Sequence, residues 1–281
     1  MVKILDGKKI RERLTTSLQN EVGNLDIKPK LIIIQIGSSK ESNIYIKEKK
    51  DYGKKIGVTV EHKKYPENVT EDLVLSDIKK FNLDPTVNGV IVQLPIPNNL
   101  DKVKIIEQID PKKDVDGLTS KNINFIIHNK EKILPATTQG IITLLENYNI
   151  DIKGKKVVIV GESFLVGRPT ALALLNRGAT ITVCHSDTKN LEQETKKSDI
   201  LIVATGVKNL ITVNHVSKNQ IVIDVGINRI NESKTIGDVN YNEVKDIVSA
   251  ITPVPGGVGP MTVFSLFNNL LKNTQKKVSY D

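Results

Sequence analysis

The stretch VVIVGESFLVGRPTALALL, residues 157–175, joins an apolar run to a second apolar segment through a turn bounded by glycines. The run before Gly161 is rich in β-branched residues, which is typical of a buried strand. Pro169 suits the first turn of a helix, because its missing N–H has no partner to lose there. The stretch therefore predicts strand, turn and helix, with a helix N-terminus able to hold a pyrophosphate. Its glycine spacing is not G-x-G-x-x-G, so a purely structural turn is the alternative.

Three more apolar runs follow at intervals of about 20 residues, as in a nucleotide-binding doubly wound sheet. They occupy residues 179–185, 199–206 and 220–228. His185 and Ser186 follow the first of these runs, where such a fold reads a ribose or its 2′-phosphate. Both are candidate cofactor contacts, although a lone histidine is more often structural. The second half of the chain thus predicts a Rossmann-type sheet.

The first half of the chain alternates strand-like and helix-like segments in the same way. The predicted strands are 30–37, 58–65 and 87–97, and a helical pattern at 6–22 precedes them. This βαβ rhythm implies a largely parallel sheet with right-handed crossovers. The loop-like stretch 110–122 interrupts the rhythm, 137–148 predicts a long helix at a candidate hinge, and 253–262 reads as a rigid Pro/Gly loop. A final apolar helix at 263–273 is expected to pack back on the first half.

Composition narrows the class of protein. The formal net charge is +8, but it comes from lysines scattered along the chain, with arginine only at 11, 13, 168, 177 and 229. Tryptophan is absent and aromatic residues are sparse, so we expect a solvated basic surface and no nucleic-acid partner. A non-enzymatic nucleic-acid binder is the competing hypothesis that the charge motivates. No apolar run reaches the roughly 18 residues of a membrane span, and the N-terminus has no signal-peptide region, so a cytoplasmic enzyme is expected. The single cysteine, Cys184, excludes an internal disulfide framework and is expected to be buried.

The lysine-rich stretch SNIYIKEKKDYGKKIG, residues 42–57, predicts a helix with two different faces. Ser38 and Glu41 match a capping box at its start, and Gly57 suits its C-terminal end. At about 100° per residue, Lys49 shares one side with Ser42, Tyr45, Tyr52 and Ile56, whereas Lys47, Lys50 and Lys54 lie roughly opposite. Lys49 either extends along this face to water or is partly desolvated beside a phenol. Desolvation would lower its pKa and suit it to proton transfer.

Two further polar positions belong to the same candidate site. Gln93 lies at the carboxyl end of a predicted parallel strand, where α/β sheets hold ligands, although a structural hydrogen bond is the alternative. Asp114 and Asp116 lie two residues apart in the interrupting loop. No other acidic or histidine ligands are grouped beside them, so we expect no metal. A single carboxylate that accepts N–H groups of a heterocycle is the better interpretation.

Seven motifs in order resemble the FolD family, the bifunctional methylenetetrahydrofolate dehydrogenase/methenyltetrahydrofolate cyclohydrolases. They are SNIYIKEK (42–49), VQLPIP (92–97), DPKKDVDG (110–117), GESFLVGRP (161–169), CHSDT (184–188), VIDVGIN (222–228) and ITPVPGGVGPMT (251–262). The resemblance covers essentially the whole chain. It implies a catalytic folate-binding domain at 1–138, completed by a C-terminal helix at 262–281, a Rossmann domain at 139–261, and a cleft between them. It also implies a homodimer.

The resemblance assigns roles to individual positions of this sequence. The implied catalytic residues are Lys49, Tyr45 and Gln93. The implied substrate contacts are Ser42, Val92, Leu94, Asp116, Pro255, Gly256, Gly257, Val258 and Gly259. The implied cofactor contacts are Gly161, Glu162, Ser163, Ser186 and Ile227, and no metal is implied. The expected reaction oxidises 5,10-methylenetetrahydrofolate with NADP and then hydrolyses the methenyl product to 10-formyltetrahydrofolate.

Departures from the family pattern at positions 162, 136 and 138 bear on these expectations. Many members carry Arg where this chain has Glu162, and Asp187 adds a second carboxylate beside Ser186. Carboxylates there would repel a 2′-phosphate that they faced, so NAD is the alternative to NADP. Ala136 and Thr138 stand where the family often has Cys and Pro. A dehydrogenase without cyclohydrolase activity, or one acting on another small acid, is the competing enzyme hypothesis.

Overall fold

The computed structural model describes residues 2–230 and 235–275, which divide into two compact units. We call residues 1–12 with 137–262 the six-stranded unit, and residues 13–136 with 263–281 the three-stranded unit. The expected first domain began at residue 1. The structure instead gives the first twelve residues to the six-stranded unit, because β1 (Lys3–Ile4) pairs in parallel with β11 (Ala250–Ile251). A two-residue strand is too short to leave a periodic signal in the sequence.

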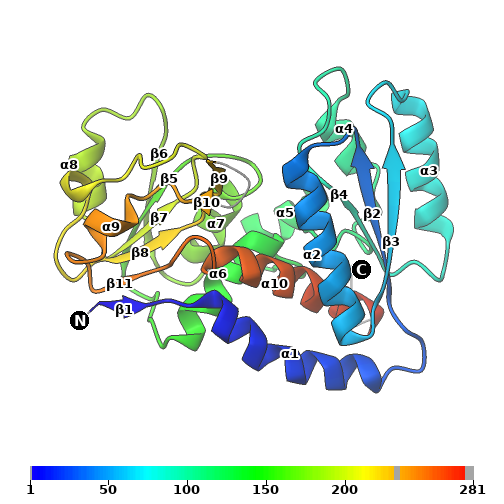
Figure 1. The fold of residues 1–281 in the computed structure, drawn as a ribbon, viewed down its shortest axis with the longest axis horizontal. Coiled ribbons are helices and arrows are strands. Elements are labelled where there is room, and N and C mark those ends of the chain that lie inside the picture. Colours follow the sequence, from blue (N-terminus) through cyan, green and yellow to red (C-terminus); the bar gives the residue numbers. More distant parts are fainter. Residues whose placement is uncertain (1, 231–234, 276–281) are drawn as a thin grey trace. The chain divides into compact units, whose positions relative to one another are not determined.

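The six-stranded unit is built on one parallel sheet with the strand order β1-β11-β8-β7-β5-β6. From β5 the chain runs to β6 on one side and then returns to β7 on the other side, so the strand order reverses at β5 (Figure 1). Such a reversal creates a crevice at the carboxyl ends of the strands, the usual ligand site of doubly wound sheets. The remaining strands are β5 (Lys156–Val160), β6 (Thr180–Cys184), β7 (Ile200–Val203) and β8 (Ile221–Asp224), with a separate β9 (Asn228–Arg229) and β10 (Thr235–Ile236) ribbon.

The central strands β5, β7 and β8 of this sheet are largely buried on both faces, as in other parallel sheets. One face packs Val158, Val160 and Leu201 into a core that includes Val244 of α9. Cys184 is fully buried in that core, as expected. Helix α7 packs beside β5 and β6. The helices are α6 (Ala136–Asn147), α7 (Gly167–Leu175), α8 (Leu191–Lys196), η1 (Val213–His215) and α9 (Tyr241–Val244).

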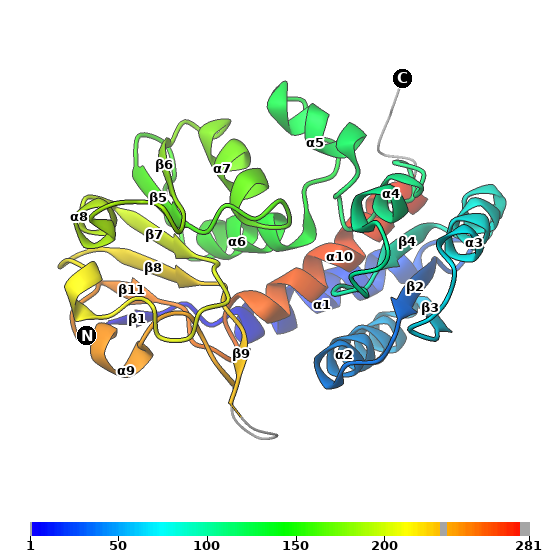
Figure 2. The same cartoon turned by 90° about the horizontal axis from the view of Figure 1, so that it is seen from above.

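The three-stranded unit has a parallel sheet in the order β3-β2-β4, with helices on both faces. Ile32, Ile34 and Ile36 of β2 point to a core shared with α3 and α4. On the other face Gln35 donates to Asn43 of α2 at 2.9 Å, and Figure 2 shows α2 and α3 on opposite sides of the sheet. The elements are β2 (Lys30–Ile36), β3 (Thr59–Tyr65), β4 (Gly89–Val92), α2 (Lys40–Ile56), α3 (Glu71–Leu83), α4 (Lys102–Glu107) and α5 (Ser120–Ile127).

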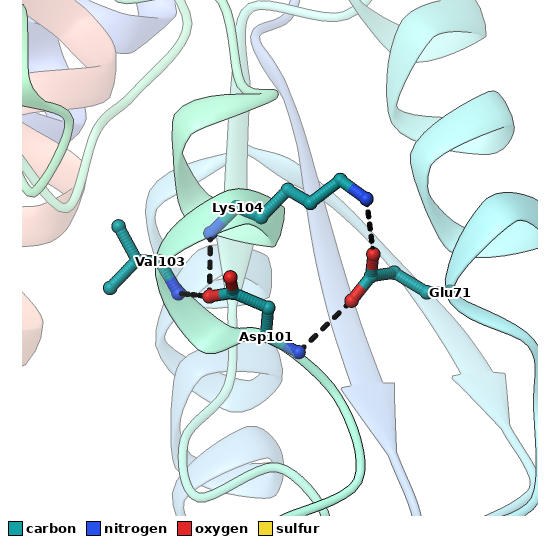
Figure 3. Close-up of polar contacts among 4 residues, drawn as sticks. All are labelled: Glu71, Asp101, Val103 and Lys104. Atoms are coloured by element: carbon teal, nitrogen blue, oxygen red, sulfur yellow. Dashed lines mark hydrogen bonds and ion pairs between the residues drawn. The ribbon is translucent and has the colours of Figure 1, made fainter.

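The starts of α3 and α4 are tied together by a small polar cluster, drawn in Figure 3. Asp101 caps α4, because its carboxylate accepts the backbone N–H groups of Val103 at 2.9 Å and Lys104 at 3.1 Å. Glu71 in the first turn of α3 accepts the Asp101 N–H at 3.0 Å and the Lys104 ammonium. The cluster therefore holds the end of the connection between β4 and α4, residues 93–101, against the start of α3.

Two long helices, α1 (Gly7–Gly23) and α10 (Val258–Thr274), contain boundaries between the units. The expected packing of the last helix on the first half is confirmed, since Phe267 packs against Tyr52 with the rings tilted and their centroids 5.4 Å apart. The Pro/Gly loop predicted at 253–262 was too long, because α10 already begins at Val258. Within the described residues 2–230 and 235–275, no helix is long and apolar enough to cross a membrane.

Candidate active site

Helix α2 presents Lys49 to the protein because its two ends are fixed. Its cap is Ser39 rather than the predicted Ser38, since the Ser39 hydroxyl accepts the Ser42 N–H at 3.0 Å. Gly57 ends the helix in the left-handed conformation, with φ of 86°, as expected. The predicted faces are confirmed: Tyr52 and Ile56 are buried, whereas Lys49 is half-buried. The lysines expected on the opposite face, Lys47, Lys50 and Lys54, are all exposed.

Lys49 and Gln93 meet directly. The Lys49 ammonium donates to Gln93 Oε1 at 2.8 Å. Gln93 follows β4 and is itself held from two sides, since its backbone N–H donates to the Ile34 carbonyl at 2.8 Å and its Nε2 donates to the Leu94 carbonyl at 2.9 Å. The amide oxygen is thereby aimed at Lys49, and the lysine is held at one defined position.

Lys49 and Asp116 influence each other electrostatically. Burial lowers the pKa of Lys49, and the charges of Asp116 and Glu48 oppose that shift. Burial raises the pKa of Asp116 to about 6, with Lys49 lowering it and Asp114 raising it. The pair therefore combines a lysine that is easier to deprotonate with a carboxyl group that titrates near neutral pH.

The two aspartates of the loop 110–119 have different surroundings. Asp114 is buried, and its carboxylate accepts N–H groups of Gly117 at 2.9 Å, Thr119 at 2.8 Å and Asn122 at 2.9 Å. The Asp116 carboxylate has no hydrogen bond within the described part of the chain. Asp114 therefore builds the loop and Asp116 is available to a ligand. Among the residues that the structure describes, no three His, Cys, Asp or Glu side chains are grouped to hold a metal.

The other predicted residues of the three-stranded unit differ in their placement. Tyr45 lies one turn before Lys49 and is half-buried. Ser42 is buried, and its hydroxyl oxygen accepts from the Ser39 hydroxyl at 3.0 Å. Val92 is buried in the core on the opposite face of the sheet, and the half-buried Leu94 packs against that same core. The structure thus groups Tyr45 with Lys49, whereas the side chains of Val92 and Leu94 both contact the core.

The turn after β5 needs glycine at both of its ends. Gly161 has φ of 112°, a conformation that other residues avoid, and a Cβ there would collide with the Ala204 carbonyl. A Cβ on Gly167 would collide with the Gly161 carbonyl. The Ser163 hydroxyl accepts the Val166 N–H at 3.3 Å, just before α7 begins. The backbone of this turn lies against β7 and leads directly into the N-terminus of α7, the arrangement that receives a pyrophosphate.

Charged side chains surround this turn. Glu162 pairs with Arg168, whose Nη2 donates to Glu162 Oε2 at 3.0 Å. Ser186 and Asp187 are exposed in the turn after β6. The sequence analysis did not predict that Arg168 pairs with Glu162. The two residues lie six positions apart, at the two ends of the turn between Gly161 and α7, and their opposite charges could have indicated the pairing.

The remaining predicted residues also belong to the six-stranded unit. Pro255, Gly256 and Gly257 form the loop before α10, and Val258 and Gly259 lie in the first turn of that helix. Ile227 is 45 % exposed, and its Cδ1 lies 3.8 Å from where a Cβ on Gly259 would stand. The structure therefore brings Ile227 to the start of α10, within the same unit as the Gly161 turn.

The six-stranded unit is a dinucleotide-binding α/β fold, because its parallel sheet reverses strand order and has a glycine turn before a helix. The other unit of the same chain holds Lys49, Gln93 and Asp116. Comparison with known proteins identifies the family. The model for the tetrahydrofolate dehydrogenase/cyclohydrolase catalytic domain matches residues 5–116, and the model for the NAD(P)-binding domain of the same family matches residues 135–278. The chain belongs to the tetrahydrofolate dehydrogenase/cyclohydrolase family, which confirms the resemblance.

Individual relatives agree over nearly the full length. The bifunctional protein FolD of Nautilia profundicola is 42% identical over 272 residues, covering 96% of both chains. The crystal structure of the bifunctional FolD enzyme from Campylobacter jejuni has a TM-score of 0.96 and 39% identity, covering 99% of this chain and 100% of its own. The FolD of Trypanosoma brucei, solved with NADP and an inhibitor, has a TM-score of 0.94 and 30% identity, covering 98% of each chain.

Proposed function

We propose that this chain is a bifunctional enzyme of one-carbon folate metabolism. It oxidises 5,10-methylenetetrahydrofolate to 5,10-methenyltetrahydrofolate with a nicotinamide cofactor, and it hydrolyses that product to 10-formyltetrahydrofolate. The observation that carries the proposal is the 2.8 Å contact between Lys49 and Gln93 beside Asp116, in a chain of this family. The nicotinamide, when bound, supplies the hydride acceptor, and the residues of the chain supply positioning and proton handling.

Lys49 is the proposed proton-transfer group of the hydrolytic half-reaction. Water adds to the methenyl carbon, and the neutral amine of Lys49 takes the proton that the water loses. The C–N5 bond then breaks, N5 receives a proton, and one proton is released overall for each formyl group formed. Burial lowers the pKa of Lys49, which makes the neutral amine accessible. Gln93 keeps the amine in place, and Tyr45 is the proposed partner one turn away.

Asp116 is the proposed anchor for the pterin. A carboxylate accepts two parallel N–H groups, and such charge-assisted hydrogen bonds are the strong ones. Within the described residues, the Asp116 carboxylate accepts no hydrogen bond, whereas the Asp114 carboxylate already accepts N–H groups of its own loop. Ser42, Leu94 and the loop of residues 255–259 are proposed as further folate contacts, and Val92 as a contact only through its backbone.

The Gly161 turn and Ser186 fit a dinucleotide, because backbone approaches β7 closely there and α7 begins directly afterwards. We propose NADP as the cofactor, with NAD as the alternative. The concern that Glu162 would repel a 2′-phosphate is reduced by Arg168, which pairs with it at 3.0 Å. The Trypanosoma brucei relative, which was solved with NADP, supports the same choice. Gly161, Ser163 and Ile227 are the other proposed cofactor contacts.

A homodimeric assembly, a cytoplasmic location and the absence of a nucleic-acid partner stay predictions from the family resemblance and the composition. Analytical ultracentrifugation tests the first of them. A single species at the monomer mass would contradict it.

The test of the proposed function follows both half-reactions with purified protein. Methylenetetrahydrofolate with NADP should generate methenyl absorbance, and methenyltetrahydrofolate alone should lose it. Absence of turnover with both NADP and NAD would refute the dehydrogenase, and stable methenyl absorbance above the buffer control would refute the cyclohydrolase. Glu162→Gln tests the cofactor: we expect a lower KM for NADP, since the net charge beside Arg168 becomes positive. A raised KM for NAD with no change for NADP would instead favour NAD.

A further inference from the structure

Two aspartates of the six-stranded unit, Asp224 and Asp238, are buried with exposed fractions of 3% and 0% and take no part in the chemistry above. Asp224 ends β8, and Asp238 follows β10. They are joined by a hydrogen bond from the Asp238 backbone N–H to Asp224 Oδ1 at 3.0 Å. Burial raises the pKa of Asp224 to about 7. Buried carboxyl groups destabilise a fold unless hydrogen-bond donors surround them, so the donors around this pair indicate its role.

The donors to Asp238 come from two loops that the strands of the sheet carry at their carboxyl ends. Oδ2 accepts from the Thr205 N–H at 2.7 Å, the Thr205 hydroxyl at 2.9 Å and the Gly206 N–H at 2.9 Å, all in the loop after β7. Oδ1 accepts from Asn228 Nδ2 at 2.8 Å, in the segment after β8. One side chain therefore fixes both loops.

Asp224 extends the arrangement to a third strand end. Its carboxylate accepts the N–H groups of Gly226 at 3.0 Å and Val239 at 3.0 Å. Its backbone N–H donates to the Thr252 hydroxyl at 2.7 Å, and Thr252 directly follows β11. The pair thus holds the ends of β7, β8 and β11 together through side-chain and backbone contacts.

The packing around the pair leaves no room for adjustment. A Cβ on Gly226 would collide with the Asp238 carboxylate, and a Cβ on Gly237 would collide with the Asp224 carboxylate. Gly226 and Asn228 stand on either side of Ile227, and both are bonded to the pair. Ile227 is consequently held with 45 % of its surface exposed.

We propose that Asp238, seated on Asp224, is a positioning residue for the cofactor: it fixes the loops after β7 and β8 so that residues 205–206 and Ile227 form a preformed surface for the dinucleotide. These loops lie at the carboxyl ends of strands next to the order reversal, where a doubly wound sheet binds its ligand. An amide would not serve, because four donors converge on the two oxygens and an amide brings a donor of its own. The inference rests on the proposed function, since it concerns the nicotinamide cofactor.

The test is Asp238→Asn. If the amide oxygen keeps the three donors of residues 205–206, its NH2 faces the NH2 of Asn228, and the segment around Ile227 must shift. We expect the KM for NADP, and its Kd measured by calorimetry without folate, to rise by about tenfold to a hundredfold, the size of one lost charge-assisted hydrogen bond. Cyclohydrolase activity, assayed without cofactor, should stay within about threefold, because Lys49, Gln93 and Asp116 belong to the other unit.

Two further variants separate positioning from a general loss of stability. The double exchange Asp238→Asn with Asn228→Asp reverses donor and acceptor across the same contact, and we expect it to recover most of the lost affinity. Asp199→Asn is the control at the opposite edge of the same sheet, since the exposed Asp199 carboxylate accepts the Lys156 N–H at 2.8 Å where β5 and β7 begin. It should leave the KM for NADP unchanged.

Three results on cofactor affinity would overturn the inference. They are wild-type cofactor affinity in Asp238→Asn, an equal loss of affinity in Asp199→Asn, and a double exchange no better than the single one. A parallel fall of both activities in Asp238→Asn, without recovery in the double exchange, would also show a merely structural role. Failure of the proposed function looks different, because the wild-type protein itself would then not bind or reduce the cofactor.

Discussion

Replacement of Lys49 by alanine is the sharpest perturbation of the proposed hydrolytic site. A positioned proton-transfer group contributes about 10²–10⁴-fold to a rate, so we expect cyclohydrolase kcat to fall by about a thousandfold. The hydride step needs no proton from the lysine, so dehydrogenase activity should fall by less than about tenfold. The loss of the Lys49 charge should also raise the pKa of Asp116 above its value of about 6. A larger share of Asp116 is then protonated at pH 7, and folate KM should rise in both half-reactions.

The structure supplies two controls for this experiment. Lys50→Ala removes the neighbouring lysine, which is exposed on the other side of α2, and should leave both activities unchanged. Lys49→Arg keeps the positive charge beside Asp116, but the guanidinium does not lose its proton near neutral pH. It should therefore restore folate KM while cyclohydrolase kcat stays low. The decay of methenyl absorbance measures the first activity, and cofactor reduction measures the second.

The outcome that contradicts the proposal is specific. Lys49→Ala with more than about a tenth of wild-type cyclohydrolase kcat would remove the lysine from the proton transfer, since even the low end of the expected effect is about a hundredfold. Equal losses in Lys49→Ala and Lys50→Ala would point to surface charge instead of the 2.8 Å contact with Gln93. A melting temperature close to wild type in both variants confirms that the comparison concerns folded protein.

Three further predictions follow from individual contacts. Asp116→Asn should weaken folate binding by about tenfold to a hundredfold. Wild-type folate affinity should fall as pH drops through about 6, where the Asp116 carboxylate becomes protonated, and the variant should lack this fall. A pH profile of folate KM identical to wild type would contradict this prediction. Gly161→Ala should lower the free energy of unfolding by at least about 2 kcal/mol more than Gly154→Ala. Both glycines have positive φ, but only a Cβ on Gly161 would collide with a backbone carbonyl. Equal losses of stability in denaturant unfolding would refute this steric argument. Tyr52→Phe should lower the free energy of unfolding by about 1 kcal/mol, because it removes the buried hydrogen bond between Tyr52 and Thr15 at 2.9 Å. Cyclohydrolase kcat should not fall. A thousandfold loss of cyclohydrolase kcat would show that Tyr52, and not Tyr45, is the catalytic tyrosine.

Much of the fold could be predicted because strands and helices with strong periodicity carry their own signal. The apolar runs at 30–37 and 157–160 each became a parallel strand, and the spacing between runs indicated the doubly wound sheet. The elements that were missed are those that only tertiary pairing creates. Strands β1 and β11 have two residues each, and they form because they pair with each other and with β8. The N-terminal segment was consequently expected in the wrong unit.

The candidate site was predictable where one helix face carries it. The spacing of Tyr45, Lys49, Tyr52 and Ile56 separated Lys49 from its exposed neighbours, and the structure has the same faces. The distinction between Asp114 and Asp116 was not available, because it depends on which carboxylate meets the N–H groups of residues 117–122. Asp224 and Asp238 were missed for the same reason, since their donors come from loops far apart in the sequence.

The departures from the family pattern are accommodated locally, which explains why they do not disturb the proposed chemistry. Thr138 places a hydroxyl in a fully buried position, but Thr170 of α7 faces it at 2.9 Å, so neither hydroxyl is left without a partner. The backbone N–H of Ala136 donates to the Asp116 carbonyl at 3.2 Å. Any residue with an N–H can make that bond, but Ala136 is buried with an exposed fraction of 1%, so a small side chain suits this position. Glu162 is paired with Arg168 in the same way. Each of these side chains is thus paired or buried outside the Lys49–Gln93 contact.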